Sequence, residues 1–377
     1  MPSKIILVKN LQPNKNKTES PNIDLISKMF IIFLSFMGWN RCGVFKINNI
    51  ISKLIFIYCI ILNVTLCYVI FWPTNIYLDC VKFVNIIGFT SCSLLSYMFT
   101  NNIYAFFEDI NIFNLNINYN TKIGKSSIHN ASFCVTYIMF VCITYIILIL
   151  LDSSNLVLCL AFIHIVFNVE LFYYGHLLSI LLLRVQLLRK MLSTYFLDGN
   201  SKYEKRELND IIILYHVIIK AFDNLNAAIK YQFLCLIIVT FFTTVIFLDL
   251  TMIQVYNGEI ELWGMAIQAM NSFVKIILPF FSPCFYAHRI CNEVSDVRNI
   301  LTANLRKLGI YISIIYDKNN RRPAKILLRL TKIRTLSFSI FRMFQVDLLL
   351  PFNLLVLIAN YLIILLQFQK VTGSGSS

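Results

Sequence analysis

Three amide side chains recur at a spacing of seven residues in the last apolar stretch of the chain. Asn353, Asn360 and Gln367 stand in Phe352–Gln369, which reads FNLLVLIANYLIILLQFQ and carries no formal charge. Because seven residues make almost two helical turns, a helix places the three amides on one face, with a drift of about 20° per step. Such a stripe either bonds to neighbouring helices inside a bundle or faces water as the lining of a pore.

The end of the same stretch carries a motif. Tyr361 is followed by five apolar residues and then by Gln367 and Phe368. This pattern resembles the C-terminal signature of insect gustatory receptors, which is Thr-Tyr, five hydrophobic residues and Gln-Phe. The sequence departs from the signature at Asn360, where the family usually has Thr. Upstream of the motif, the chain also resembles the segment that precedes the family's last helix, at Phe341, Val346, Asp347 and Leu350.

The resemblance implies a chemosensory subunit of a ligand-gated, non-selective cation channel in the plasma membrane of sensory neurons. A small extracellular tastant would open it. Four subunits, identical or from related receptors, would surround one pore that passes sodium, potassium and calcium. The positions expected to line or gate the pore are Asn353, Asn360, Ile364, Gln367 and Phe368.

Two further comparisons narrow the resemblance. The related odorant receptors lack the Tyr…Gln-Phe ending, so the gustatory branch fits better. Sugar-sensing members carry Glu directly after the motif's Tyr, where this chain has Leu362. A receptor for bitter compounds and a fructose-type receptor both remain open.

Ionisable side chains inside apolar runs are costly, and they are therefore candidates for function. Glu170 and Lys275 lie about 15 and about 13 residues from the outer ends of their runs, which are similar depths at about 1.5 Å per residue. An ion pair between them would either fix the register of two helices or form the floor of a ligand pocket open to the outside.

Neighbouring polar residues extend this candidate pocket. Gln268 and Asn271 share one helical face with Lys275, and His164 and Asn168 share a face of another helix. A pocket with a few amides and aromatic walls suits a small polar or amphipathic molecule. The complete set of pocket candidates is Lys82, His164, Asn168, Glu170, Gln268, Asn271 and Lys275.

No enzyme motif accompanies these residues. The sequence has no nucleophile elbow, P-loop, paired metal-ligand motif or Gly-rich dinucleotide turn. His164 and His176 are 12 residues apart, which does not place them on one helical face, so a zinc site is not expected. We therefore expect no enzymatic activity, metal or cofactor. The alternative class is a polytopic transporter or membrane enzyme that works as a monomer.

The composition is that of a membrane protein. Of the 377 residues, 58% are hydrophobic and 14% charged, and the mean hydropathy is +0.71. A soluble domain would carry about 25% charged residues. The formal net charge of +14 stands in blocks between apolar runs, which indicates a positive-inside membrane protein rather than a nucleic-acid-binding one. Membrane lipid is the expected surrounding.

Seven apolar stretches are long enough to cross a bilayer, which predicts an all-α membrane protein with seven transmembrane helices. Pro351 lacks a backbone donor and is expected to break the last helix into two halves. The shorter run Met29–Met37 predicts a re-entrant or interfacial helix. The seven stretches are about 54–72, 83–107, 132–151, 155–183, 231–250, 262–287 and 335–369.

The positive charges predict the topology. Of the 33 Lys and Arg residues, 28 fall in the N-terminal segment or in alternate connections, and the three other short connections have none. Because Lys and Arg favour the cytoplasmic side, the N-terminus is expected in the cytoplasm and the C-terminus outside. This orientation is the reverse of that of G-protein-coupled receptors.

Three stretches have apolar residues at helical spacing beyond the predicted spans: Leu178–Leu197, Ile211–Lys230 and Val294–Leu308. They suit lipid-surface helices, whereas the resemblance favours cytosolic helical extensions that form an anchor domain. The expected organisation is a cytoplasmic segment (1–53), six transmembrane helices with extensions and an outer ligand pocket (54–288), a basic cytoplasmic segment (289–334), the pore-forming last helix (335–370) and a linker-like tail (371–377).

Overall fold

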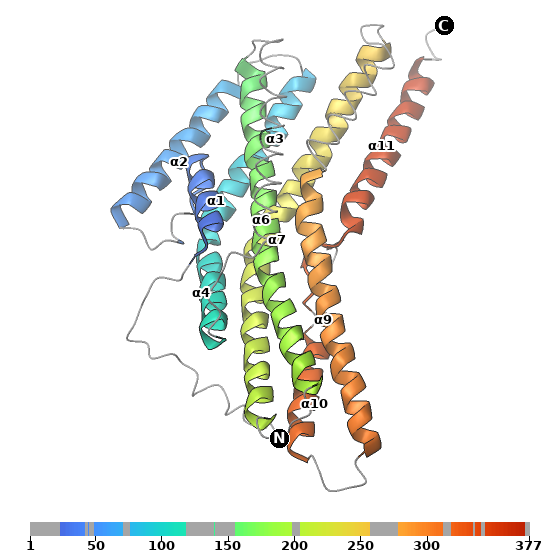
Figure 1. Ribbon diagram of the computed structural model, residues 1–377. Helices are drawn as coiled ribbons and strands as arrows, with labels where there is room; N and C mark the ends of the chain where they lie inside the picture. Colours follow the sequence, from blue (N-terminus) through green and yellow to red (C-terminus); the bar gives the residue numbers. More distant parts are fainter. Residues whose placement is uncertain are drawn as a thin grey trace, which may run out of the picture.

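The computed structural model describes residues 23–41, 44, 49–70, 76–117, 139, 155–197, 204–256, 278–311, 318–334, 336–340 and 344–373. This part of the chain is almost entirely helical (Figure 1), which confirms the predicted all-α fold class. Most of the predicted span 132–151 and the first part of 262–287 lie outside the described residues, so the count of seven spans stays a prediction.

Three long helices form the centre of the molecule: α6 (Asn155–Leu197), α7 (Glu204–Tyr256) and α9 (Leu278–Tyr311). Their 43, 53 and 34 residues exceed the roughly 20 that cross a bilayer. Most of α6 is buried between its neighbours α7 and α9. The stretches Leu178–Leu197, Ile211–Lys230 and Val294–Leu308 are helical, as expected, whereas their place outside the membrane and the anchor domain stay predictions.

Outward-facing apolar side chains support a membrane setting. In the described part of the chain, α3 (Ile76–Met98), α6 and α7 are long and apolar enough to cross a membrane. The neighbouring α2 (Asn49–Ile70) exposes large apolar residues on much of its surface. Exposure of so many apolar groups to water would be costly, whereas lipid accepts them. These side chains include Leu54, Ile57, Ile61, Val64 and Tyr68.

The first helix, α1 (Leu25–Phe36), overlaps the expected short helix at Met29–Met37 and begins four residues earlier. Asp24 starts it as N-cap, because its carboxylate accepts the backbone N–H of Ser27 at 3.1 Å. Ile31 and Leu34 are buried on the face that packs against α6. Whether α1 lies at the membrane surface or enters the membrane stays a prediction.

The helix predicted at 83–107 is divided in two. A break at Phe99 separates α3 from α4 (Thr100–Asn116). The hydroxyl of Thr100 donates to the carbonyl oxygens of Ser96 and Asn40, so the break is held by polar contacts. The helix α4 packs against the lower part of α7 (Figure 1).

The prediction of a last helix in two halves is wrong. The helix α10 (Lys318–Ile333) is followed by two short antiparallel strands, β1 (Ser339–Ile340) and β2 (Phe344–Gln345), and α11 (Leu349–Gly373) begins only after them. Asp347 starts α11 by accepting the backbone N–H of Leu349 at 3.0 Å. Pro351 stands in the first turn, where a helix needs no N–H donor, so it does not break the helix.

Candidate functional site

The last helix, α11, is held to the rest of the chain along one narrow stripe. Leu354 and Ile358 are buried, with Leu362 beside them, at a spacing of four residues. They pack against Phe241 and Val245 of α7. In Figure 1, α11 stands at the edge of the molecule beside the upper parts of α7 and α9, which are the helices it contacts.

The three amides lie on the opposite side of α11. At about 100° of rotation per residue, Asn353, Asn360 and Gln367 lie roughly 140–180° from the middle of the buried stripe. All three are exposed in the single chain, and the flanking Ile364 is 47% exposed. The amide stripe therefore does not bond α11 to the helices that the structure describes.

The motif residues divide between these two faces. The ring of Tyr361 packs edge to face on Phe241, with 6.2 Å between the ring centroids, so this residue helps to seat α11 on α7. Gln367 is exposed. The backbone of Phe368 belongs to α11, whereas its side chain lies outside the described part of the structure.

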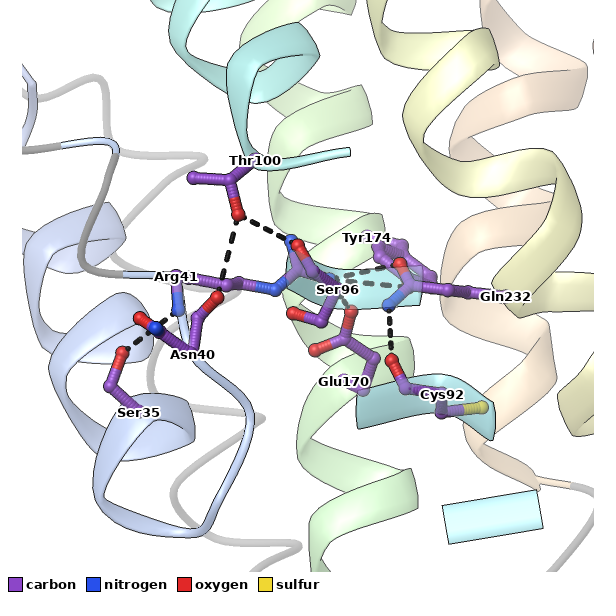
Figure 2. Close-up of polar contacts among 9 residues, drawn as sticks. All are labelled: Ser35, Asn40, Arg41, Cys92, Ser96, Thr100, Glu170, Tyr174 and Gln232. Atoms are coloured by element: carbon purple, nitrogen blue, oxygen red, sulfur yellow. Dashed lines mark hydrogen bonds and ion pairs between the residues drawn. The ribbon is translucent and has the colours of Figure 1, made fainter. Parts of the chain in front are cut away.

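A buried polar cluster surrounds Glu170 in the middle of the molecule (Figure 2). The Nη2 group of Arg41 forms an ion pair with Glu170 and donates to the side-chain oxygen of Gln232 at 3.1 Å. The hydroxyl of Tyr174 donates to the same oxygen of Gln232. Gln232 in turn donates from Nε2 to the carbonyl oxygen of Cys92 at 3.0 Å. Arg41 and Glu170 have no exposed side-chain surface.

This cluster joins four parts of the fold. Arg41 belongs to the segment between α1 and α2, Cys92 to α3, Glu170 and Tyr174 to α6, and Gln232 to α7. The aromatic face of Tyr173 lies 5.0 Å from the guanidinium carbon of Arg41 and adds a cation–π contact. A buried carboxylate and guanidinium need such partners, because charges without them are very costly to bury.

Glu170 therefore has a different partner from the expected one. Its ion pair is with Arg41, and Lys275, Gln268 and Asn271 lie outside the described residues. The sequence did contain a signal, since a lone acid in an apolar run requires a cation. Arg41, however, lies 129 residues before Glu170 in the sequence, where it is one of several basic residues of the N-terminal segment.

The other pocket candidates are distributed over α3 and α6. Lys82 is buried and pairs with Asp79 of its own helix at 2.9 Å. His164 packs edge to face on Phe167. Asn168 is buried one turn further along α6. Asn168 and Glu170 both lie on α6, two positions apart. Lys82 lies on α3.

A second ion pair holds α1 on α6. The carboxylate of Asp24 contacts Nε2 of the buried His176 at 3.1 Å. The ring of Phe30 lies against both Tyr173 and His176, with centroid distances of 5.7 and 5.8 Å. The segment from Asp24 to Arg41 is thus attached to α6 at both of its ends.

Comparison with known proteins identifies the fold. The chain is similar in structure to the insect olfactory receptor OR5 from Machilis hrabei in complex with eugenol, with a TM-score of 0.63 and 14% sequence identity over 91% of this chain and 97% of that one. A second structure of the same receptor gives a TM-score of 0.54 and 12% sequence identity over 90% of this chain and 97% of that one. No protein-family model and no curated protein sequence matches the chain.

The chain thus has the fold of the insect olfactory receptors. This result confirms, at the level of the fold, the resemblance to the insect gustatory receptors and their relatives, the odorant receptors.

Proposed function

We propose that the chain is a subunit of a ligand-gated, non-selective cation channel that a small extracellular molecule opens. The observation that carries the proposal is the exposed amide face of α11, which lies opposite the stripe of Leu354 and Ile358 that packs on α7. Copies of this face around an axis would form an uncharged polar pore. The olfactory receptor fold supports the same conclusion.

The stimulus that we propose is a tastant. The support comes from the C-terminal motif with Tyr361, Gln367 and Phe368, which resembles the gustatory signature. Leu362 follows the motif's Tyr, so a sugar receptor of the main sweet group is not favoured. The cell of action is a sensory neuron, whose plasma membrane the channel spans as a homotetramer or together with related receptors.

Voltage clamp of oocytes that express the chain tests the proposal. Eugenol, caffeine and D-fructose serve as probes, because they cover an amphipathic aromatic, a bitter compound and a sugar. We expect currents with channel-sized unitary conductance and little preference among sodium, potassium and calcium. Asn360→Leu should lower unitary conductance, because it removes one ring of amides from the pore.

Images of the purified protein provide an independent test. Fourfold symmetry with α11 nearest the axis is the expected result. A monomer in the images, together with substrate uptake and no channel-sized currents, would contradict the proposal and favour a transporter. Leu94→Ala is the control for Asn360→Leu, since Leu94 is an exposed apolar residue of α3 that lies far from α11 in the sequence.

A further inference from the structure

The polar cluster of Arg41, Glu170, Tyr174 and Gln232 is buried inside the helical bundle. Apolar residues of similar volume often stabilise a protein as well as a buried ion pair does. A buried charge pair that a protein retains can instead select one arrangement of its helices over another. The cluster is well placed for that task, because it joins α3, α6 and α7 to the segment after α1.

One helix leads from this cluster to α11. Gln232, which belongs to α7, accepts a hydrogen bond from Arg41. The same helix carries Phe241 and Val245, which pack against the buried stripe of α11. These residues follow Gln232 by 9 and 13 positions, or about 14 and about 20 Å along the helix axis. A shift or rotation of α7 at Gln232 therefore moves the surface on which α11 rests.

The bonding of Arg41 leaves room for a second arrangement. Its Nη2 group contacts Glu170, Tyr174 and Gln232, whereas Nε and Nη1 have no partner among the described residues. The second carboxylate oxygen of Glu170 is also without a partner there. A guanidinium has five N–H donors in a planar fork. Rotation of that fork can therefore exchange one set of contacts with Glu170 and Gln232 for another.

We propose that Arg41 is a positioning residue for gating, which holds α7 against α6 through Glu170 and Gln232 and thereby favours the closed position of α11. The inference rests on the proposed channel function. It assigns no contact with ligand or permeant ion to Arg41. When the cluster is weakened, α7 is released and the closed state loses its preference over the open one.

The test is the open probability of single channels in oocyte patches without any added ligand. Glu170→Gln keeps the shape of the side chain and removes its charge, and Tyr174→Phe removes one hydroxyl without leaving an unpaired charge. We expect both variants to raise the basal open probability, Glu170→Gln by about 5- to 150-fold, the usual range of coupling between sites. Unitary conductance should stay unchanged, since neither residue lies on α11.

Two controls separate gating from general destabilisation. Asp109→Asn weakens another polar contact of α7, the ion pair with Lys220 at 2.8 Å, on the side of Gln232 away from α11. It should leave the basal open probability unchanged. Exchange of the charges in Arg41→Glu/Glu170→Arg should bring the open probability closer to the wild-type value than Glu170→Gln does.

The outcomes are distinguishable. A wild-type chain without channel currents overturns the proposed function, and this inference falls with it. If the wild type conducts, the Tyr174→Phe variant decides the inference alone. A Tyr174→Phe channel that reaches the surface with an unchanged or lower basal open probability overturns the inference but not the proposed function. Tyr174→Phe decides the matter even if Glu170→Gln does not reach the surface. An equal rise of the basal open probability in Asp109→Asn and Glu170→Gln would also overturn the inference.

Discussion

Asp24 shows how one side chain starts a helix and fastens it to the core. Its carboxylate accepts the N–H of Ser27 and contacts the ring of His176 on α6. Burial raises the pKa of Asp24, but the hydrogen bond and charge of His176, together with the bonds from Ser27, outweigh burial and lower that pKa to about 2. The folded chain therefore favours the ionised form of this carboxyl.

Substitution of Asp24 separates its two tasks. Asp24→Ala removes both the cap and the contact with His176, and loss of a cap alone costs about 0.5–2 kcal/mol. Asp24→Asn keeps a good cap and loses only the charge, so its effect should be smaller. Hydrogen exchange of the α1 amides measures the difference, because it reports local opening. Equal protection in the two variants would show that the cap contributes nothing.

The pH dependence of α1 follows from the same pKa. Because the folded-state pKa of Asp24 lies below its ordinary value of 3.8, the stabilisation is present above about pH 4 and is lost as the pH falls towards 2. Hydrogen exchange of α1 at several pH values should show protection that declines across this window. The decline should be absent in Asp24→Asn, and a variant with the wild-type profile would assign the effect to another group.

At the scale of elements, two glycines let helices approach closely. A Cβ atom on Gly88 of α3 would lie 2.2 Å from Cγ2 of Val239 on α7, and one on Gly175 of α6 would lie 2.1 Å from Oγ of Ser282 on α9. These distances are far shorter than van der Waals contact. At these two positions, α3 approaches α7 and α6 approaches α9 more closely than a residue with a side chain would allow.

Gly88→Ala should accordingly destabilise the contact between α3 and α7. Overpacking of a tight site costs about 1–3 kcal/mol. Val239→Ala makes room for the added methyl group, so the double variant should be more stable than Gly88→Ala alone. The melting temperature of the detergent-solubilised protein is the measurement. If the two substitutions are simply additive, Val239 is not the residue that Gly88 must accommodate.

The sequence predicts the elements better than it predicts their partners. Apolar runs and their helical spacing predict α1, α6, α7 and the apolar part of α11, because these depend on local composition. The division at Phe99 and the strands before α11 depend on hydrogen bonds that composition does not reveal. Arg41 pairs with Glu170 across 129 residues, and periodicity contains no information about such a contact.

The candidate site divides in the same way. The face formed by Asn353, Asn360 and Gln367 follows from spacing alone, since one helix carries all three. A pocket needs several helices at known depths and rotations, which a single sequence does not supply. The sequence therefore marks Glu170 as unusual but does not reveal its surroundings.

At the scale of the whole molecule, the distribution of Lys and Arg predicts the orientation. The N-terminal segment and the alternate connections together hold 28 of the 33 positive charges. A tag at the C-terminus should therefore be stained on intact cells, whereas a tag at the N-terminus should be stained only after permeabilisation. The two tagged chains serve as controls for each other. The opposite staining pattern would contradict the orientation and place the motif end of α11 inside the cell.

The last prediction concerns the gate at that end of α11. In a tetramer with its C-terminus outside, four copies of Phe368 meeting on the axis would form an apolar constriction, which stops ions by dewetting rather than by charge. Gln367 lies about 100° round the helix from Phe368. A modest rotation of α11 would therefore replace a ring by an amide at the axis.

Phe368→Ala tests whether this constriction is the gate. A gate without its ring should leak, so the variant should carry constitutive current in oocytes without any added ligand. Leu94→Ala is the control, because Leu94 is an exposed apolar residue of α3 and its loss should not produce a leak. If Phe368 only packs against lipid or a neighbouring helix, Phe368→Ala will behave like this control. A Phe368→Ala channel that reaches the surface and conducts only after a probe is added would contradict the gate, because dewetting needs the apolar ring that the substitution removes.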